Sequence, residues 1–324
     1  MRKAALLYNA RSGGRKNHRE ADLLKALSIM GDAGVETSLV RTTSNVHATE
    51  QARKAIVEGY DTVFACGGDG TIHDVLQAMA GSRVALGVIP LGTANALAHD
   101  LGLPMQPAEA VRAALHAEAR RIAVGRVTVR GLDGNPVTRY FTVAVGIGVD
   151  AHLFYELHAG TKQRLGMAAY YAKAWHLWFT HRMARFRVEV GSAADMVSRN
   201  GVTEMLAVRI RHFGGMVQEL APGASLDRND MRVVVCTTSN RLSYLLYVVR
   251  GLTRGRWSVP AVELFHAGRV RCDYAAGSNS ATHSASAGES AKVYVEADGE
   301  LIGTLPAEIT MVPDALTILS APRK

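Results

Sequence analysis

The sequence is poor in cysteine and has no long apolar run. Its three cysteines, Cys66, Cys236 and Cys272, lie far apart among 324 residues. Their spacing matches no zinc site and cannot supply a disulfide framework, so we expect a reducing compartment. No stretch of about 18 uncharged apolar residues is present, so no membrane-spanning helix is predicted. The apolar run within residues 1–8 is too short for a signal peptide, and we expect a cytoplasmic protein that reaches lipid from a peripheral position at the membrane.

Acidic residues are fewer than basic ones, 29 against 37, which gives a formal net charge of +8. A basic balance favours anionic partners, such as nucleotide phosphates, nucleic acid or an anionic membrane surface. However, the chain lacks a lysine-rich arm and lacks the alternation of basic and aromatic residues that single-strand binders use. We therefore expect no nucleic-acid partner.

The sequence also lacks an internal repeat, and its length predicts about two domains. Over roughly the first 125 residues, strand and helix patterns alternate, which predicts βαβ units and a largely parallel sheet. The expected strands are 4–8, 35–41, 62–66 and 84–89, and the expected helices are 17–33, 48–58, 72–79 and 94–101.

After about Ile122 the pattern changes to short strands with turn signals between them, which predicts a second, mainly antiparallel domain. The expected strands are 124–130, 138–145, 186–190, 204–210, 232–237, 270–272, 292–296 and 309–312. Two helical insertions, 165–181 and 241–251, interrupt them. Residues 275–290 are rich in Ser, Ala and Gly and are expected to form a loop.

Four loops follow the predicted parallel strands, at the end of an open sheet where ligands bind. They span 9–14, 42–45, 67–71 and 90–95. The first lacks the spacing of a Walker A loop and is compatible with a simple turn or with an anion site. The second is typical of a helix N-cap, and the fourth suits a cap or a phosphate site equally.

The third loop, Gly67-Gly68-Asp69-Gly70-Thr71, is the most informative segment. Three glycines exceed what one turn needs, whereas a phosphate cradle needs backbone N–H groups that approach an anion closely. The carboxylate of Asp69 could hold a water–metal network or orient a hydroxyl. This loop therefore indicates a kinase.

A late segment, Glu296-Ala297-Asp298-Gly299-Glu300, has two possible interpretations. Asp-Gly is the strongest short signal for a hairpin turn. Alternatively, the carboxylates on this turn could provide a general base, because phosphoryl transfer needs a group that accepts the proton of the attacking hydroxyl.

Together these segments resemble the diacylglycerol kinase catalytic family, most closely its bacterial lipid-kinase branch, which is related to sphingosine and ceramide kinases. The matching pieces are Asn9-x-x-Ser12-Gly13, Gly67–Thr71, Pro90–Asn95, Gly146–Ala151 and Asp298–Glu300. The third loop alone is shared with NAD kinases and phosphofructokinases. Its combination with Gly-Thr-Ala-Asn and a late Asp-Gly-Glu is much more specific.

The resemblance implies an ATP-binding α/β domain over 1–123, to which 312–324 return, and a β-sandwich lipid-substrate domain over 124–311. It implies an enzyme of phospholipid biosynthesis that transfers the γ-phosphoryl group of ATP, with Mg²⁺, to the hydroxyl of a lipid such as diacylglycerol. The implied partners are the lipid substrate and a peripheral membrane surface, with a homodimer as one arrangement of the chain.

The resemblance also assigns roles to residues. Glu300 is the expected proton acceptor, and Asp298 joins it as a catalytic residue. Asp69 and Asp298 are the candidates for contact with the magnesium of Mg–ATP. The residues expected to bind ATP are Asn9, Ser12, Gly13, Thr42, Gly67, Gly68, Asp69, Gly70, Thr71, Gly92, Thr93 and Asn95.

Three departures from the family pattern stand out. The family's usual Asn-Glu pair after the third loop is His73-Asp74 here, and its Asp-Phe pair after the fourth loop is Ala96-Leu97. An accessory magnesium loop of bacterial relatives carries Arg228 at a ligand position, and a guanidinium cannot ligate a cation. Two other functions stay open: a soluble-substrate kinase of the NAD kinase type, and a non-catalytic nucleotide or lipid sensor.

Overall fold

The computed structural model describes residues 1–9, 19–149, 151, 183–192, 195–213, 219–253, 255, 257–275 and 292–321. Ser12, Gly13, the predicted insertion at 165–181 and nearly all of the predicted loop at 275–290 lie outside the described residues.

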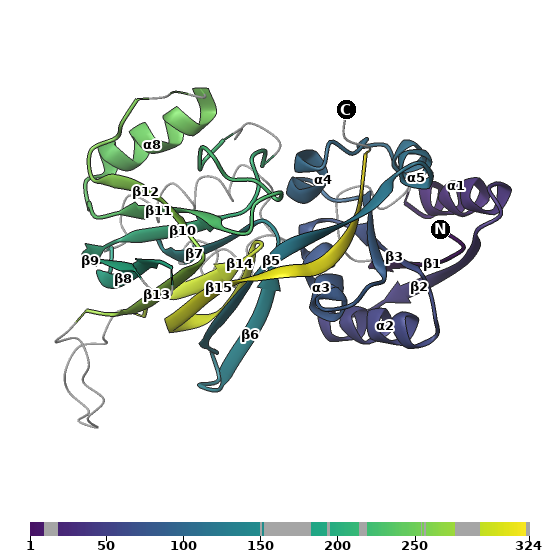
Figure 1. The fold of residues 1–324 in the computed structure, drawn as a ribbon, viewed down its shortest axis with the longest axis horizontal. Helices are drawn as coiled ribbons and strands as arrows, with labels where there is room; N and C mark the ends of the chain where they lie inside the picture. Colours follow the sequence, from purple (N-terminus) through teal and green to yellow (C-terminus); the bar gives the residue numbers. More distant parts are fainter. Residues whose placement is uncertain are drawn as a thin grey trace, which may run out of the picture.

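The first half of the chain forms a parallel sheet with helices around it (Figure 1), as predicted. Its strands are β1 (Lys3–Asn9), β2 (Glu36–Thr42), β3 (Thr62–Gly67) and β4 (Ala85–Pro90), in the order β4-β3-β1-β2. Its helices are α1 (Arg19–Asp32), α2 (Asn45–Val57), α3 (Asp69–Met79), α4 (Ala96–Asp100) and α5 (Pro107–Leu115). Every residue of β3 and β4 is buried, as expected for strands covered on both faces.

Helix α5 has no counterpart in the sequence prediction. It begins with Pro107 in its first turn, a favourable position because the missing N–H has no partner there. Its buried face consists of Pro107, Ala110, Val111 and Ala114. These buried residues recur at helical spacing, so the sequence pattern is compatible with the helix although it was not predicted.

The second half is built from antiparallel strands and one described helix. The strands are β5 (Glu118–Arg130), β6 (Pro136–Phe141), β7 (Ala144–Gly148), β8 (Phe186–Gly191), β9 (Met196–Val202), β10 (Glu204–Val208), β11 (Met231–Cys236), β12 (Val262–Ala267), β13 (Arg269–Tyr274), β14 (Tyr294–Ala297) and β15 (Glu300–Ser320). Helix α8 (Arg241–Thr253) confirms the helix predicted at 241–251. Strands β9 and β12 were not predicted, and the strand predicted at 138–145 is in fact two strands, β6 and β7.

Strand β15 joins the two halves. It pairs with β14 at its start, with β5 along most of its length, and in parallel with β4 near its end, where Thr317 lies opposite Ala85. The described strands therefore form one continuous sheet, ordered β12-β11-β10-β7-β14-β15-β4-β3-β1-β2 along its main path. The domain limits at 123 and 311 stay predictions.

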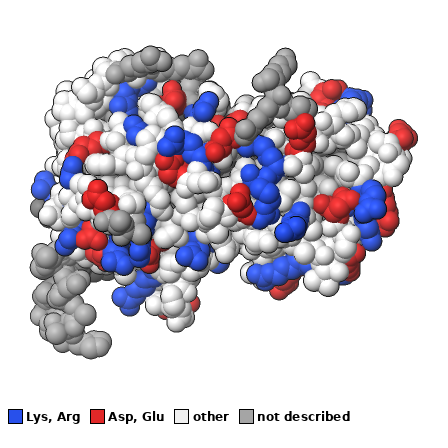
Figure 2. All heavy atoms as spheres, viewed as in Figure 1, with Lys and Arg blue, Asp and Glu red and all other residues white. Residues whose placement is uncertain are grey.

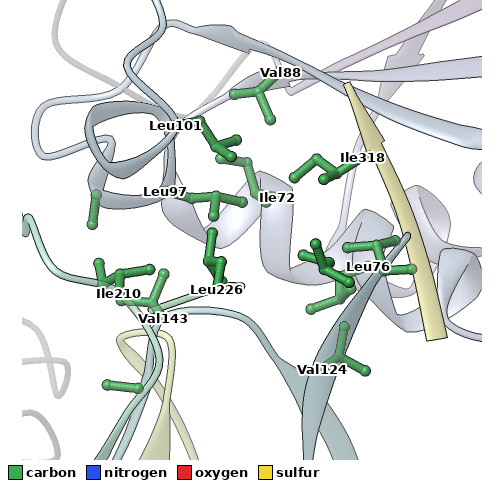
Figure 3. Packing of buried hydrophobic residues seen from close by; sticks show 14 of the residues in the cluster. Ile72, Leu76, Val88, Leu97, Leu101, Val124, Val143, Ile210, Leu226 and Ile318 are labelled. Carbon is green, nitrogen blue, oxygen red and sulfur yellow. The ribbon is translucent and has the colours of Figure 1, made fainter. Parts of the chain in front are cut away.

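One apolar core lies where the halves meet (Figure 3). It combines side chains of α3 and α4 with others from β5, β15 and the segments around residues 143, 210 and 226. The residues labelled in Figure 3 are Ile72, Leu76, Val88, Leu97, Leu101, Val124, Val143, Ile210, Leu226 and Ile318. Because this core is shared, it fixes the position of one half against the other.

Candidate active site

The register of the parallel strands brings the predicted loops to one edge of the sheet. Asn9 at the end of β1 pairs with Thr42 at the end of β2, and Gly67 at the end of β3 pairs with Pro90 at the end of β4. Strands β1 and β3 also pair side by side. The loops that follow these strands therefore start from adjacent positions, as the sequence analysis expected.

The third and fourth loops touch through glycine. A Cβ atom built on Gly92 would lie 2.4 Å from the Cα atom of Gly68, and one on Gly68 would lie 3.1 Å from the Cα atom of Gly92. The N–H of Leu91 also donates to the carbonyl of Gly67 at 3.0 Å. Only glycine permits this close backbone contact. The packing of the two loops therefore explains why both positions are glycine, whether or not a ligand binds there.

Two polar side chains brace the fourth loop. Asn95 has a left-handed backbone (φ 49°, ψ 47°), and its side-chain amide both accepts from the N–H and donates to the carbonyl of Gly92, each at 3.0 Å. Asp69 reaches over from the third loop, and its Oδ1 accepts from the N–H of Ala96 at 2.7 Å. Burial raises the pKa of the Asp69 carboxyl; the N–H of Ala96 opposes this increase and the nearby Asp298 adds to it.

The start of α3 is suited to an anion. Its N-cap, Gly68, provides no side-chain cap, so the first N–H groups of the helix are not satisfied by that residue. Gly67 leaves space that the Thr71 side chain fills, because a Cβ on Gly67 would lie 2.3 Å from Thr71 Oγ1. A helix N-terminus with a glycine-rich approach attracts phosphate.

Asp298 and Gly299 form the two-residue turn between β14 and β15. Both have positive φ, 49° and 83°, as a type I′ hairpin turn requires. The interpretation of this segment as a hairpin turn is therefore confirmed, and it does not compete with the catalytic interpretation, because the same turn presents the two carboxylates.

The Asp298 carboxylate holds the backbone of the second half. Its oxygens accept from the N–H groups of Thr142, Val143 and Ala144 at 3.0, 2.9 and 3.1 Å. These N–H groups turn to a carboxylate instead of a neighbouring strand, which explains why the predicted strand 138–145 breaks between β6 and β7. Asp298 is buried, so this arrangement fixes the turn firmly.

Glu300, partly exposed, follows the turn and lies against α3. A Cβ on Gly70 would lie 2.8 Å from Glu300 Oε1, so the missing side chain of Gly70 makes room for this carboxylate. Asp74 lies one helical turn beyond Gly70, on the same face of α3. Burial raises the pKa of Asp74 to about 7; His73 lowers it, Glu300 raises it and Arg139 lowers it.

His73 and Asp74, the residues that depart from the family pattern, both face the turn. His73 is buried, and its Nδ1 lies 3.5 Å from Oδ2 of Asp298. Asp74 lies one helical turn from Gly70, which lies against Glu300, and the charge of Glu300 contributes to the raised pKa of Asp74. Sequence reasoning treated the pair only as a departure, since nothing in a single sequence places α3 against a hairpin more than 200 residues later.

Two further residues predicted to bind ATP, Thr42 and Thr93, belong to the second and fourth loops. The Thr42 hydroxyl donates to the carbonyl of Tyr8 at 3.2 Å, and its residue is buried. Thr93 is exposed beside Gly92, at the contact between the loops. Across the described part of the chain, no group of three or more His, Cys, Asp or Glu side chains is arranged to hold a metal ion. The ligand roles of all these residues stay predictions.

Comparison with known protein families decides the identity of this fold. The model of the diacylglycerol kinase catalytic domain matches residues 3–127, and that of the YegS C-terminal NAD kinase beta sandwich-like domain matches residues 143–320. The chain belongs to the diacylglycerol kinase catalytic-domain family. It is therefore a kinase, and the family implies ATP as its phosphoryl donor.

Curated relatives of this kinase carry the same family name. It is 28% identical to the diacylglycerol kinase of Bacillus subtilis (strain 168) over 313 residues, 95% of this chain and 93% of that protein. It is 28% identical to the diacylglycerol kinase of Staphylococcus aureus (strain MRSA252) over 256 residues, 78% of this chain and 76% of that protein.

Solved structures share the fold of this kinase. A crystal structure of a diacylglycerol kinase from Bacillus anthracis (strain Sterne) superposes with a TM-score of 0.69 at 16% identity, over 99% of this chain and 97% of that chain. The yeast NADH kinase complexed with NADH gives a TM-score of 0.50 at 10% identity, over 99% of this chain and 84% of that chain.

The loop that carries Arg228 is organised around a different arginine. The buried guanidinium of Arg209 donates to backbone carbonyls of Ala123, Ser225, Leu226, Arg228 and Asp230. Burial lowers the pKa of Arg209 only to about 10, so its charge remains at neutral pH. These carbonyl oxygens already accept hydrogen bonds from the positively charged guanidinium of Arg209. The loop therefore does not fit an accessory magnesium ion.

Proposed function

We propose that this kinase transfers the γ-phosphoryl group of ATP to the hydroxyl of a lipid related to diacylglycerol, with Glu300 as the proton acceptor. The position of Glu300 carries this proposal. Its carboxylate lies beside Gly70 at the start of α3, next to the loop that binds phosphate in our interpretation. A base at this position reaches a hydroxyl that attacks a phosphate held by the loop.

The third and fourth loops would hold the phosphates through backbone N–H groups, and positioning supplies most of the rate enhancement in such reactions. When bound with ATP, Mg²⁺ neutralises charge on the phosphates. Mg²⁺ usually takes only one or two protein carboxylates beside phosphate oxygens and water, so Asp69 alone is an adequate protein donor.

Asp298 is better suited to positioning than to proton transfer or metal binding. Its two oxygens already accept three backbone hydrogen bonds, which use most of the acceptor capacity of a carboxylate. We therefore assign Asp298 to holding the turn that presents Glu300.

A lipid acceptor is supported by the names of the curated relatives. A soluble acceptor of the NAD type is the second candidate, because the fold also matches the yeast NADH kinase. The two candidates differ in the molecule that becomes phosphorylated, so one assay separates them.

The assay is transfer of γ-labelled phosphate from Mg–ATP to diacylglycerol, ceramide and sphingosine in micelles, and to NAD and NADH in solution. We expect label on one of the lipids. Glu300→Gln should lower kcat by at least about 100-fold, because it removes a general base, with little change in nucleotide affinity.

Glu308→Gln is the matched control, because Glu308 lies on the same strand β15 and pairs with Arg269. It should retain full activity. Label on NAD or NADH and none on lipid would support the soluble-substrate kinase, and wild-type rates in Glu300→Gln would remove Glu300 from the proposed role.

A further inference from the structure

Helix α8 has an unusual distribution of side chains. The face toward the body of the protein buries Ser243, Tyr244, Tyr247 and Arg250, whereas Leu242, Leu245 and Leu246 are 60%, 38% and 40% exposed. The three leucines recur at helical spacing, so they lie on one side of the helix. A surface helix normally turns its leucines toward the core, whereas these three leucines of α8 lie on its outer side.

The inner face of α8 is firmly attached. Tyr244 and Thr203 share a hydrogen bond of 2.6 Å between their hydroxyls, and the Tyr247 hydroxyl donates to the carbonyl of Leu220 at 2.7 Å. The Arg250 guanidinium lies over the ring of Tyr247, 4.9 Å from its centre. The leucines are therefore presented outward by a fixed helix, and repacking of α8 would break these contacts.

The charge of this part of the chain has one sign. Residues 241–257 include four arginines and no aspartate or glutamate; Arg250 is buried on the inner face, and Arg254 and Arg256 lie outside the described residues. Trp257, just after the helix, is also exposed, at 46%. Figure 1 shows α8 at the outer end of the second half, and Figure 2 shows mostly uncharged atoms with a group of blue Lys or Arg atoms in that region.

Exposed leucines, a neighbouring exposed tryptophan and a sequence segment that carries only basic charges are the features of a helix that lies in the interface of an anionic membrane. Helix α8 has 13 residues, fewer than the roughly 20 needed to cross a bilayer. Among the described residues, no helix is long and apolar enough to span a membrane.

We infer that the outer face of α8, formed by Leu242, Leu245 and Leu246, docks this kinase on bilayers that contain anionic lipid. The inference rests on the proposed function, because an enzyme that phosphorylates a membrane lipid must reach the bilayer surface. The apolar side chains enter the interface, and the basic charges of the segment attract the surface charge.

The test is co-sedimentation of the full chain with vesicles of phosphatidylcholine alone and of phosphatidylcholine with phosphatidylglycerol. We expect binding to the mixed vesicles and weaker binding to phosphatidylcholine alone. The triple variant Leu242→Ser, Leu245→Ser, Leu246→Ser should bind mixed vesicles about 100-fold more weakly, because each buried leucine contributes to interfacial affinity. Since the leucines are only partly covered, the variant should stay folded at the assay temperature, with a melting temperature a few degrees below that of the wild type and an unchanged circular dichroism spectrum.

Leu24→Ser is the control, because Leu24 is 58% exposed on α1 in the other half of the molecule. It should bind vesicles as the wild type does. Equal vesicle binding by the triple variant and the wild type would overturn the inference, as would absence of wild-type binding. Analytical ultracentrifugation gives a further way to overturn the inference. If the wild type and Leu24→Ser are dimers and the triple variant is a monomer, the outer face of α8 binds a second copy of the chain instead of a membrane.

A separate measurement distinguishes failure of docking from failure of the proposed function. With a short-chain diacylglycerol that is monomeric in water, the triple variant should keep the wild-type kcat, whereas with diacylglycerol in mixed vesicles its rate should fall. If the wild type phosphorylates diacylglycerol neither as a monomer in water nor in mixed vesicles, the proposed function is wrong. The vesicle co-sedimentation experiment would still test whether α8 docks on membranes.

Discussion

At the scale of single residues, the carboxyl group of Asp74, which lies near Glu300, has a strongly raised pKa. The pKa of Asp74 is about 7, well above the ordinary value of a carboxyl group, chiefly because of burial and also because of Glu300. Between roughly pH 4 and pH 7 the folded protein therefore holds a proton that the unfolded chain has lost. The free energy of unfolding falls as pH rises through this range.

Asp74→Asn should remove this pH dependence. An amide stays neutral, so the variant escapes the unfavourable ionisation that the wild type undergoes above about pH 7. We expect its melting temperature to exceed that of the wild type, and the difference to be larger at pH 8 than at pH 5. Asp32→Asn, at an exposed position on α1, is the control and should show no such trend. A constant difference at both pH values would contradict the assignment.

Gly70 offers a second prediction at this scale. A Cβ at this position would lie 2.8 Å from Glu300 Oε1, and the flexible end of the Glu300 side chain can move away. Gly70→Ala should therefore lower kcat by about 10- to 100-fold through misplacement of the base, with the fold retained. Gly31→Ala, on α1 with open space around it, should leave kcat unchanged. Full activity in Gly70→Ala would show that the position of Glu300 is not critical.

The sequence identified the glycine loops and the late Asp-Gly-Glu because each is a short continuous motif. It did not reveal that His73 and Asp74 face the hairpin turn, since that proximity depends on how α3 packs against a distant part of the chain. The role of Asp298 in holding three backbone N–H groups was hidden for the same reason.

At the scale of elements, the 225–230 loop depends on Arg209. Five backbone carbonyls surround this guanidinium, and the loop also bonds outward, through Asp227, to Arg120 of β5 at 2.5 Å. Loss of the buried cation would leave these carbonyls without their donor.

Arg209→Met should thus lower the free energy of unfolding by about 3 kcal/mol or more, as expected when one partner of a buried charged network is removed. Urea denaturation measures this change. Arg187→Met, at an exposed arginine on β8, should change stability little. The wild-type midpoint should be the same with EDTA and with Mg²⁺, and a marked loss of stability in EDTA would show that a metal ion supports the fold.

Strand and helix patterns predicted most elements but not their interruptions. The alternation of the first half followed from buried apolar strands and amphipathic helices. The break between β6 and β7 could not be predicted, because its cause is the carboxylate of Asp298 on a remote turn. Helix α5, in contrast, was not predicted although its buried residues recur at helical spacing, so here the sequence did carry the signal.

At the scale of the whole molecule, the two halves share one core and one sheet. Strand β15 lies between β14 and β4 in the strand order. A fragment that ends at residue 127 would lack this strand. Strand β4, whose residues are all buried in the intact protein, would then become an unpaired edge strand exposed to solvent.

We expect the 1–127 fragment to be insoluble or largely unfolded by circular dichroism. Coexpression with a 128–324 fragment should restore soluble protein, because β15 then completes the sheet. A soluble and cooperatively folded 1–127 fragment would show that the first half does not need β15.

The long pairing of β5 with β15 has a mechanical consequence. The chain passes between the halves on two antiparallel strands that are hydrogen-bonded to each other, with irregularities between Thr304 and Ala307 and between Val312 and Leu316. A paired ribbon resists twisting far more than a single flexible tether does. Any rotation of one half against the other would therefore have to bend this ribbon as well as disturb the shared core, and Glu300, the first residue of β15, would move with it.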